Sequence, residues 1–310
     1  MLAAAVCIAA LILDALLGEP RRLHPLVLFG GLATRAERRF NPDGRGGVGA
    51  GAKALALLVL PPVLLVGVLV LVLPGWVMLA LEVVLLYLAI GLRSLADHGR
   101  AVAEPLLDGD LPAAREAVSA LVSRDTARLD ESAVAGAASE SVLENGADAV
   151  FASLFWFLLA GLPGLILHRL VNTLDAMWGY RTPRYAAFGR VVARLDDVLN
   201  WIPARLTALA YSLVGRTVGG LWCWWTQASA WESPNAGPVM AAGAGALGVR
   251  LGGPAPYHGG WRTRPELGEG ALPDATTVLA AIVLVRRAVM LWLVVIMLGG
   301  VAWSLITAAG

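Results

Sequence analysis

Lysine is almost absent from this chain of 310 residues. It occurs once, at Lys53, whereas arginine supplies the other 23 basic residues. No Gly-Lys-Ser or Gly-Lys-Thr sequence is present, which excludes a Walker A loop. Lys53 stands at the foot of an apolar run, which is a poor place for a pyridoxal Schiff base. Any bound phosphate must therefore be held by arginine forks, backbone N–H groups or a metal.

Charged residues and cysteines are also scarce. Only 15% of the residues are charged, and the mean hydropathy is +0.70. A typical soluble domain has about 25% charged residues, so the composition predicts an integral membrane protein. The net charge of +1 gives no reason to expect nucleic acid as a partner. Cys7 and Cys223 stand in apolar sequence without metal-ligand spacing, and we interpret both as buried thiols.

Long apolar runs supply the predicted membrane helices. A helix needs about 20 mainly apolar residues to cross a bilayer. The sequence predicts an all-α membrane protein with about four spanning helices, and six spanning helices are the alternative. The four runs are Leu2–Leu17, Ala54–Leu73, Trp76–Leu92 and Ala288–Ile306. The first run lacks a preceding basic segment and an A-x-A cleavage site, so we expect a retained helix and not a signal peptide.

The distribution of arginine predicts which segments face the cytoplasm, because cytoplasmic loops carry an excess of basic residues. Residues 1–92 are predicted to form membrane helices with a basic cytoplasmic loop at 18–53, which includes Arg21 and Arg22. Three further segments complete the predicted division: a cytoplasmic helical segment at 93–148, a membrane-associated catalytic region with amphipathic helices at 149–277, and a C-terminal membrane helix at 278–310. Asp110 and Asp125 are expected to cap helices of the second segment.

Ala149–Leu167 is a run of nineteen residues without a charge. If this run and a returning segment both crossed the membrane, the arginines from Arg169 to Arg194 would lie outside, against the positive-inside rule. We therefore expect a re-entrant or protein-buried hydrophobic helix, broken at Gly161–Gly164. The topology with six spans remains the alternative.

Three carboxylates precede this run. Glu140, Glu144 and Asp148 are spaced by four residues and would line one face of an α-helix, with Asn145 beside them. A solvated acidic face is one interpretation. Because the face leads directly into an apolar run, where idle carboxylates are costly, a functional role is the other.

The stretch Asn172–Ala208 combines carboxylates, amides and arginines. Asn172 and Asp175 are three residues apart and share a helix face. Asp196 and Asp197 follow several arginines, which a lattice of salt bridges on the membrane surface would explain. Carboxylates near several arginines also suit a magnesium–phosphate site, because Mg²⁺ binds one or two carboxylates plus phosphate oxygens. The sequence leaves both interpretations open.

A Gly- and Pro-rich stretch follows. The sequence "SPNAG" begins at Ser233 and is typical of a turn that offers backbone N–H groups and polar side chains to an anion.

These polar segments resemble the adenosylcobinamide-phosphate synthases of cobalamin biosynthesis, the CobD/CbiB family of integral membrane proteins. The resemblance runs from residue 13 to about residue 270 in family order. The segments that carry it are "LDALLGEPRRLHPLVLFG", "VSRDTARLDESAVAGAASESVLENGADAV", "NTLDAMWGYRTPRYAAFGRVVARLDDVLNWIPARLTA", "SPNAG" and "GALGVRLGGP".

The resemblance implies an ATP- and magnesium-dependent amide synthesis in the bacterial inner membrane, with the active site facing the cytoplasm. A propionate of adenosylcobyric acid would be joined to the amine of aminopropanol phosphate or a related amino-alcohol phosphate. The implied partners are these substrates, ATP, the lipid bilayer and other membrane enzymes of cobalamin assembly. Charge-free Trp and Phe surfaces would receive the large corrin.

The candidate site residues are assigned on this reading. Glu144, Asn172 and Asp175 are the candidate catalytic residues. The candidate ligands of Mg²⁺ are Asp175, Asp196 and Asp197. The candidate residues for substrate and phosphate are Arg181, Arg184, Arg194, Arg205, Ser233 and Asn235.

Two other classes remain open at this point. A membrane sensor of the AmpE type, linked to β-lactamase regulation, would share the architecture without this chemistry. A transporter would place charged residues inside clean spanning helices, whereas here they concentrate between the apolar runs.

Overall fold

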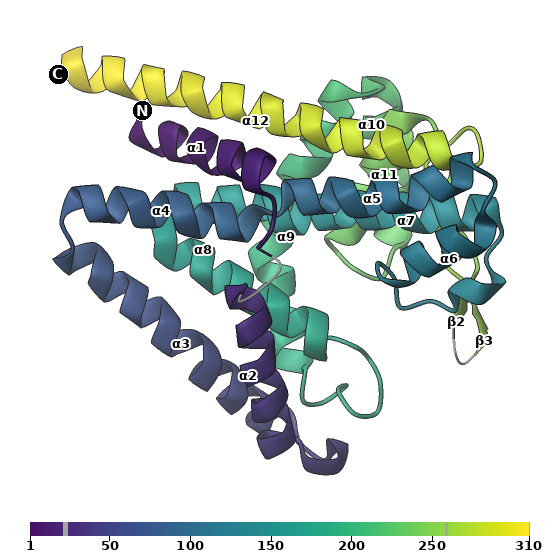
Figure 1. Ribbon diagram of the computed structural model, residues 1–310, viewed down its shortest axis with the longest axis horizontal. Coiled ribbons are helices and arrows are strands. Elements are labelled where there is room, and N and C mark those ends of the chain that lie inside the picture. Colours follow the sequence, from purple (N-terminus) through teal and green to yellow (C-terminus); the bar gives the residue numbers. More distant parts are fainter. Residues whose placement is uncertain (21–23, 258–259, 310) are drawn as a thin grey trace. The chain divides into compact units, whose positions relative to one another are not determined.

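Helices dominate the computed structural model, which describes residues 1–20, 24–257 and 260–309 (Figure 1). Arg21 and Arg22 of the predicted basic loop lie outside the described residues. The α-helices are α1 Leu2–Leu17, α2 Pro25–Phe40, α3 Val48–Val72, α4 Gly75–Ile90, α5 Leu92–Leu107, α6 Leu111–Ser119, α7 Glu131–Asn145, α8 Ala152–Trp178, α9 Arg190–Val214, α10 Thr217–Gln227, α11 Ala236–Leu247 and α12 Ala275–Ala309. The predicted all-α class is confirmed.

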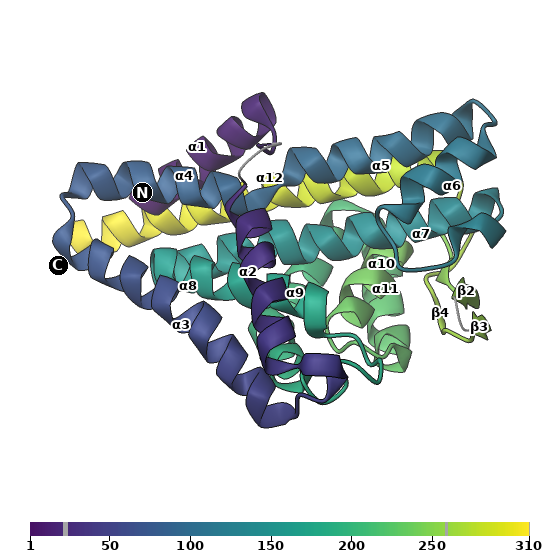
Figure 2. The same ribbon diagram turned by 60° about the horizontal axis from the view of Figure 1, so that its bottom comes forward.

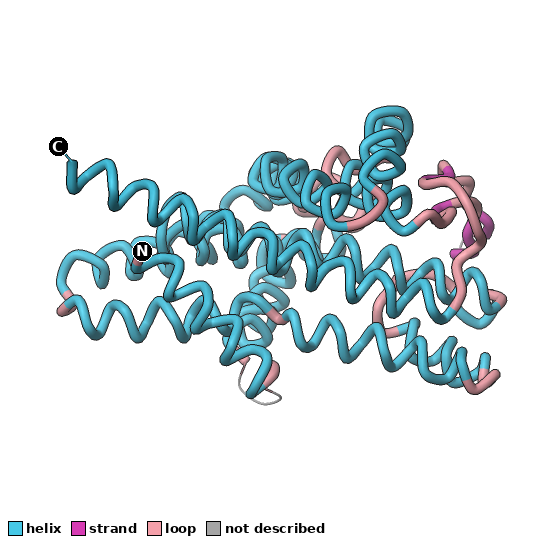
Figure 3. The backbone as a smooth tube through the Cα atoms, turned by 90° about the horizontal axis from the view of Figure 1, so that it is seen from above, coloured by secondary structure: helices cyan, strands magenta, loops and turns pink. Residues whose placement is uncertain are grey.

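Short elements complete the described chain. A π-helical turn, Gly146–Phe151, follows α7, and 3₁₀ turns occur at Pro42–Gly44, Thr126–Arg128 and Ala228–Ala230. The strands lie within a single segment of the chain, as Figure 3 shows. They form two antiparallel pairs: β1 Leu251–Gly252 with β4 Glu266–Leu267, and β2 Ala255–Tyr257 with β3 Gly260–Arg262.

Helix starts follow local capping chemistry. The Asp110 carboxylate accepts a hydrogen bond from the backbone N–H of Ala113, as predicted, and thereby caps α6. The predicted capping role of Asp125 is wrong. The helix α7 begins six residues later and is capped by Asp130, whose carboxylate accepts from the N–H of Ala133 at 2.8 Å.

Four described helical segments are long and apolar enough to cross a membrane: Val48–Val72, Gly75–Leu107, Glu131–Trp178 and Ala275–Thr307. The predicted number is confirmed, but one member differs. The first run, Leu2–Leu17, forms a helix of 16 residues and falls short of a full span. The segment that contains Ala149–Leu167 takes its place, because α7, the π-turn and α8 follow one another from Glu131 to Trp178 with a single break inside α8.

The helix α8 is broken where the sequence predicted a break. Ala160 (φ −134°, ψ 16°) and Gly161 (φ 61°, ψ −152°) leave the helical conformation. A φ of 61° favours glycine, and Pro163 suits the first turn of the helix that resumes afterwards. The predicted interruption of this hydrophobic helix is confirmed.

The chain divides into two units that each combine segments far apart in sequence. Unit 1 consists of residues 92–151 and 201–310 with Met1, and unit 2 consists of residues 2–91 and 152–200.

In unit 1, α5, α6, α7 and α12 pack around small and branched apolar side chains (Figure 2). α7 is buried from Val134 to Leu143. α10 and α11 pack backbone to backbone. A Cβ atom added to Gly219 would lie 2.6 Å from the carbonyl oxygen of Gly245, and one added to Gly245 would lie 2.3 Å from that of Gly219.

In unit 2, α2, α3 and α8 enclose a core that includes Phe29, Leu174, Trp178 and Phe188. The rings of Trp178 and Phe188 meet edge to face, with centroids 4.9 Å apart. The predicted basic loop at 18–53 is largely helical in its described part, since it contains α2 and the beginning of α3.

Candidate functional site

A buried ion cluster centres on Glu140 of α7 in unit 1. The two carboxylate oxygens each accept a hydrogen bond of 2.8 Å from Nη2 of Arg264. Arg124 donates to Oε2, and the backbone N–H of Gly252 donates to Oε1 at 2.8 Å. The three charged side chains expose 11% (Arg124), 8% (Arg264) and 5% (Glu140) of their surface. The Glu140 carboxylate thus joins distant parts of the chain, because Gly252 and Arg264 each lie more than 100 residues from it in sequence.

Arg264 also lies over the ring of Trp231, with its guanidinium carbon 4.8 Å from the ring centroid. Burial alone would lower the pKa of Arg264, but the charge and hydrogen bonds of Glu140 outweigh burial and raise it. The guanidinium therefore stays charged.

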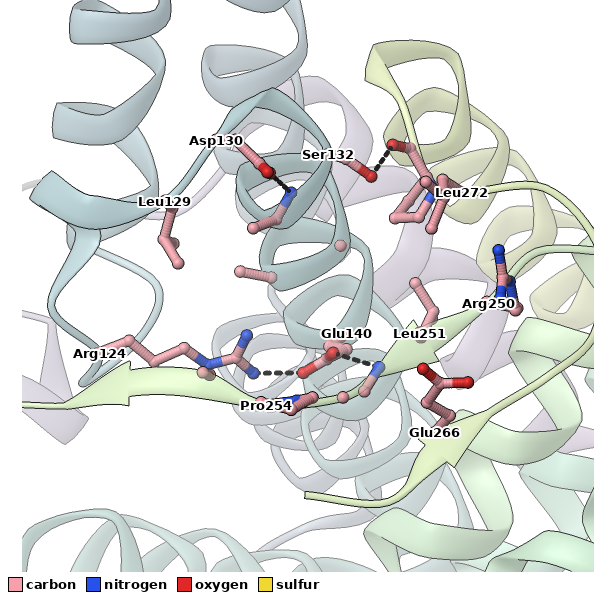
Figure 4. A pocket seen from close by; sticks show the side chains of 17 residues that line it. Arg124, Leu129, Asp130, Ser132, Glu140, Arg250, Leu251, Pro254, Glu266 and Leu272 are labelled. Carbon is pink, nitrogen blue, oxygen red and sulfur yellow. Dashed lines mark hydrogen bonds and ion pairs between the residues drawn. The ribbon is translucent and has the colours of Figure 1, made fainter. Parts of the chain in front are cut away.

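A pocket with a volume of about 250 Å³ opens beside this cluster (Figure 4). Its charged lining residues are Arg124, Asp130, Glu140, Arg250 and Glu266. A second pocket, of about 700 Å³, shares part of its wall with the first, including Asp130 and Ser132, and is otherwise lined largely by leucines and acidic residues. Both pockets lie within unit 1.

A glycine pair shapes the first pocket. Gly252 and Gly253 have φ values of 80° and 74°, which favour glycine. A Cβ atom on Gly252 would lie 2.2 Å from the carbonyl oxygen of Pro265. Because Gly252 pairs with Glu266 across the β1–β4 ladder, the ladder holds Glu266 at the pocket wall.

The predicted acidic face of α7 is only partly realised. Glu140 is buried in the ion cluster, and Glu144 is half-buried on the same helix. The α-helix ends at Asn145 and continues as a π-helical turn, so the α-helical spacing expected between Glu144 and Asp148 is wrong.

The structure brings together three of the predicted phosphate-binding residues at the start of α11 in unit 1. Arg205 donates to Oδ1 of Asn235 at 3.4 Å, and its guanidinium lies 4.0 Å from the ring centroid of Trp201. The Ser233 hydroxyl accepts from the N–H groups of Asn235 and Ala236 at 3.3 and 3.1 Å. Ser233 thus occupies the backbone N–H groups that were predicted to meet an anion, and Arg205 supplies a cation beside them.

In unit 2, a chain of amide and carboxylate groups links α8 with α9. Nδ2 of Asn200 donates to Oδ2 of Asp196 at 3.0 Å, and Nδ2 of Asn172 donates to Oδ1 at 3.3 Å. Nε2 of the buried His168 lies 2.8 Å from Oδ1 of Asn200. Burial raises the pKa of Asp196 to about 6, although both amides oppose the shift.

The predicted magnesium ligands do not form a compact set. The described residues contain no group of three His, Cys, Asp or Glu side chains placed to hold a metal ion. Asp197 is half-buried, and burial raises its pKa against the charges of Arg194 and Arg181. The Asp175 carboxylate lies against Gly179, where an added Cβ atom would be 2.2 Å from Oδ1.

Arg184 makes a bidentate pair that the sequence analysis did not anticipate. Its Nε and Nη2 atoms each donate at 3.0 Å to the buried carboxylate of Glu37. Asn41 donates both to that carboxylate at 2.9 Å and to the carbonyl oxygen of Arg184 at 3.0 Å. Arg181 and Arg194 are exposed. The fork of Arg184 is thus occupied by protein.

The chain matches the family model described as CobD/Cbib protein over residues 7–285. The chain belongs to the CobD/CbiB family. Its CobD/CbiB relatives include the cobalamin biosynthesis protein CobD of Stutzerimonas stutzeri (strain A1501), which is 60% identical over 94% of this chain and 96% of the relative. The protein of the same name from Chromobacterium violaceum is 54% identical over 91% of this chain and 92% of the relative. No solved structure matches the chain.

Proposed function

We propose that this protein joins aminopropanol phosphate, or a related amino-alcohol phosphate, to adenosylcobyric acid in an ATP-dependent amide synthesis that gives adenosylcobinamide phosphate. The observation that supports the proposal most strongly is family membership over residues 7–285, with relatives named as cobalamin biosynthesis proteins that align along nearly their whole length. Family membership favours this enzyme over the sensor of the AmpE type.

Amide synthesis through an acyl phosphate requires three properties of the site. A carboxylate is a poor acyl donor, so the propionate oxygen first takes the γ-phosphoryl group of ATP and releases ADP. The amine then attacks the carbonyl carbon and phosphate leaves. The site must therefore bind phosphate groups, accept the proton that the amine loses, and exclude water from the acyl phosphate.

The described residues offer groups for these tasks. Arg205 at the start of α11 is the proposed phosphate ligand, because its described acceptors are neutral oxygens and a guanidinium prefers an anion. Glu144, Asn172 and Asp175 remain the candidates for proton transfer and orientation.

Mg²⁺ remains part of the proposal, and it would neutralise phosphate charge when bound. Asp196 fits a metal poorly, since both oxygens accept hydrogen bonds from amide groups and burial raises its pKa to about 6. Asp197 and Asp175 remain the proposed ligands, because Mg²⁺ needs only one or two protein carboxylates besides phosphate oxygens.

We also propose that the protein sits in the bacterial inner membrane with its active site facing the cytoplasm, where ATP is available. Corrinoid substrate and other membrane enzymes of cobalamin assembly are its proposed partners. A cysteine placed at the exposed Thr182 should resist a membrane-impermeant maleimide in intact cells and react after the cells are opened. Labelling in intact cells would overturn this orientation.

The activity is tested with purified protein in detergent. We expect adenosylcobyric acid to be converted to a product heavier by the amino-alcohol phosphate minus water, and one ADP to be released per amide formed. Omission of ATP, magnesium or the amino-alcohol phosphate should abolish the product. Absence of product from the complete mixture, with protein that remains folded, would refute the proposed reaction.

A further inference from the structure

The helix α2 of unit 2 has two kinds of exposed side chain along one stripe. The members of this stripe follow one another at intervals of three or four residues and are Leu28, Leu32, Arg35 and Arg39. Leu28 and Leu32 expose 56% and 49% of their surface, and both arginines are exposed as well. The opposite face, which includes Ala33, is buried in the core of unit 2. The stripe therefore begins apolar and ends basic.

The helix α3, which is long and apolar enough to cross a membrane, shows the same change in reverse order. Its stripe begins at the exposed Lys53 and continues with Leu57, Leu60 and Leu64, which expose 61%, 53% and 66% of their surface. Because residues 41–47 connect α2 with α3, the basic parts of both stripes lie at the same end of the helix pair (Figure 1). Long basic side chains at the foot of an apolar membrane helix extend to the lipid headgroups. The change from apolar to basic therefore marks one level on both helices.

Five exposed cations lie at this end, and we call them the basic patch: Arg35, Arg38, Arg39, Arg45 and Lys53. No ion pair joins any of them to a carboxylate among the described residues. Of the two carboxylates in the described residues 24–53, Glu37 is buried and bound by Arg184, so only Asp43 is exposed. The basic patch therefore has an excess of four positive charges within this segment.

The neighbouring segment 179–190 adds no negative charge. It packs against the connection between α2 and α3, where Asn41 donates to the carbonyl oxygen of Arg184 at 3.0 Å. A Cβ atom added to Gly44 would lie 3.3 Å from the Cα atom of the same arginine. The segment contains arginines but no Asp or Glu. A surface with this balance of charge attracts an anion.

The place of the basic patch on the helices determines which anion it fits. A free phosphate or a nucleotide matches the cations alone and leaves the leucines of both stripes exposed. A phospholipid has a phosphate next to its acyl chains, so it matches the basic and the apolar parts of both stripes at once. Arginine binds phosphate oxygens through two parallel N–H groups, and basic residues beside a membrane helix are attracted to anionic lipids.

We propose that the basic patch binds the headgroup phosphates of anionic phospholipids, while the leucines of the two stripes contact the acyl chains. This contact fixes the level at which unit 2 meets the membrane surface. None of the five residues of the basic patch is assigned to the proposed reaction, so the inference goes beyond the proposed function and does not depend on it.

The test is native mass spectrometry of the full chain in detergent with equal concentrations of two lipids, anionic phosphatidylglycerol and zwitterionic phosphatidylcholine. Matched acyl chains make the headgroup the difference between them. Arg35→Gln/Arg39→Gln removes two charges from the stripe of α2, and Arg35→Lys/Arg39→Lys keeps them. Arg128→Gln/Arg262→Gln is the control, because both arginines are exposed in unit 1 and the net charge changes by the same amount.

We expect the wild type to retain phosphatidylglycerol over phosphatidylcholine by at least about fivefold, a difference of about 1 kcal/mol. The Gln variant should reduce this preference at least about threefold, because two of the charges that attract the lipid are gone. The Lys variant should keep the preference within about twofold, and the control should equal the wild type.

Several results would overturn the inference. A wild type without a preference, or a Gln variant that keeps it, contradicts binding at the basic patch. An equal loss in the control would assign the effect to net charge, and an equal loss in the Lys variant would show that charge at these positions does not bind the lipid. Displacement of phosphatidylglycerol from the wild type by excess ATP would make the patch a nucleotide site. None of these measurements requires amide synthesis, so failure of the proposed reaction leaves their outcome unchanged.

Discussion

Two buried carboxylates, Glu140 in unit 1 and Asp196 in unit 2, are held by different kinds of donor. Glu140 accepts from two guanidinium groups and a backbone N–H. Asp196 accepts from the side-chain amides of Asn172 and Asn200. Guanidinium groups supply the opposite charge that a buried anion needs, whereas amides supply only dipoles. Burial alone therefore does not decide whether a carboxylate of this protein is ionised. The charge of the group that donates hydrogen bonds to it decides as well.

Glu140→Gln should have the largest effect on stability. The substitution leaves two buried guanidinium groups without a counter-charge, and breaking a buried pair commonly costs about 3–5 kcal/mol. Denaturant titration in detergent measures the loss. Glu116→Gln, at an exposed position on α6, should change the free energy of unfolding by less than about 0.5 kcal/mol. If Glu140→Gln lowers the free energy of unfolding by less than about 1 kcal/mol, the two guanidinium groups stabilise Glu140 no more than an exposed ion pair would.

The second largest effect should be a change of stability with pH, and it should come from the ionisation of Asp196. Its pKa is about 6 in the folded protein and has an ordinary value of 3.8, so the folded state keeps the proton to higher pH than the unfolded state. Stability from this group is therefore lost as pH rises from about 4 to about 6, by up to about 3 kcal/mol. Asp196→Asn should flatten that part of the stability profile, measured in the presence of a chelator. An identical slope in the variant would show that Asp196 is ionised throughout.

Arg205→Lys should have an intermediate effect on substrate binding. The described acceptors of Arg205 are neutral oxygens of Trp201, Pro234 and Asn235, so its fork can receive a phosphate. We expect the KM for ATP to rise at least about tenfold, or about 1.4 kcal/mol, because an ammonium cannot copy a bidentate fork. Thermal stability should hardly change. An unaltered KM would assign Arg205 to the structural support of the turn.

Arg184→Lys should have the smallest effect on catalysis. Glu37 occupies the fork of this arginine, and the guanidinium is exposed on its other side. We expect the KM values for both phosphorylated substrates to stay within about twofold of the wild type, since exposed ion pairs contribute little. Steady-state assays of both variants side by side provide the check. A rise comparable with that of Arg205→Lys would return Arg184 to the substrate site.

Local features of the fold could be predicted from the sequence, and longer-range ones could not. The break in α8 follows from Gly161 and Pro163, whose conformational preferences act at their own positions. The capping of α6 by Asp110 is equally local. The extent of the helical stretch from Glu131 to Trp178 could not be predicted, because charged residues stand on both sides of the apolar run Ala149–Leu167.

The candidate site shows the same limit. Asn172 and Asp196 were selected for their residue types, and the structure brings them together. Arg124, Arg250 and Glu266 were not selected, because their relation to Glu140 depends on how the glycine pair at Gly252 docks on α7. One sequence contains no pattern that links residues more than 100 positions apart.

The contact between Gly219 and Gly245 brings the backbones of α10 and α11 directly together. In lipid, helices associate through close packing of small residues, because apolar side chains gain little by leaving an apolar solvent. These two helices meet through their backbones, because neither glycine carries a side chain that would hold them apart. A single methyl group at either glycine would meet the facing carbonyl oxygen and force the two backbones apart.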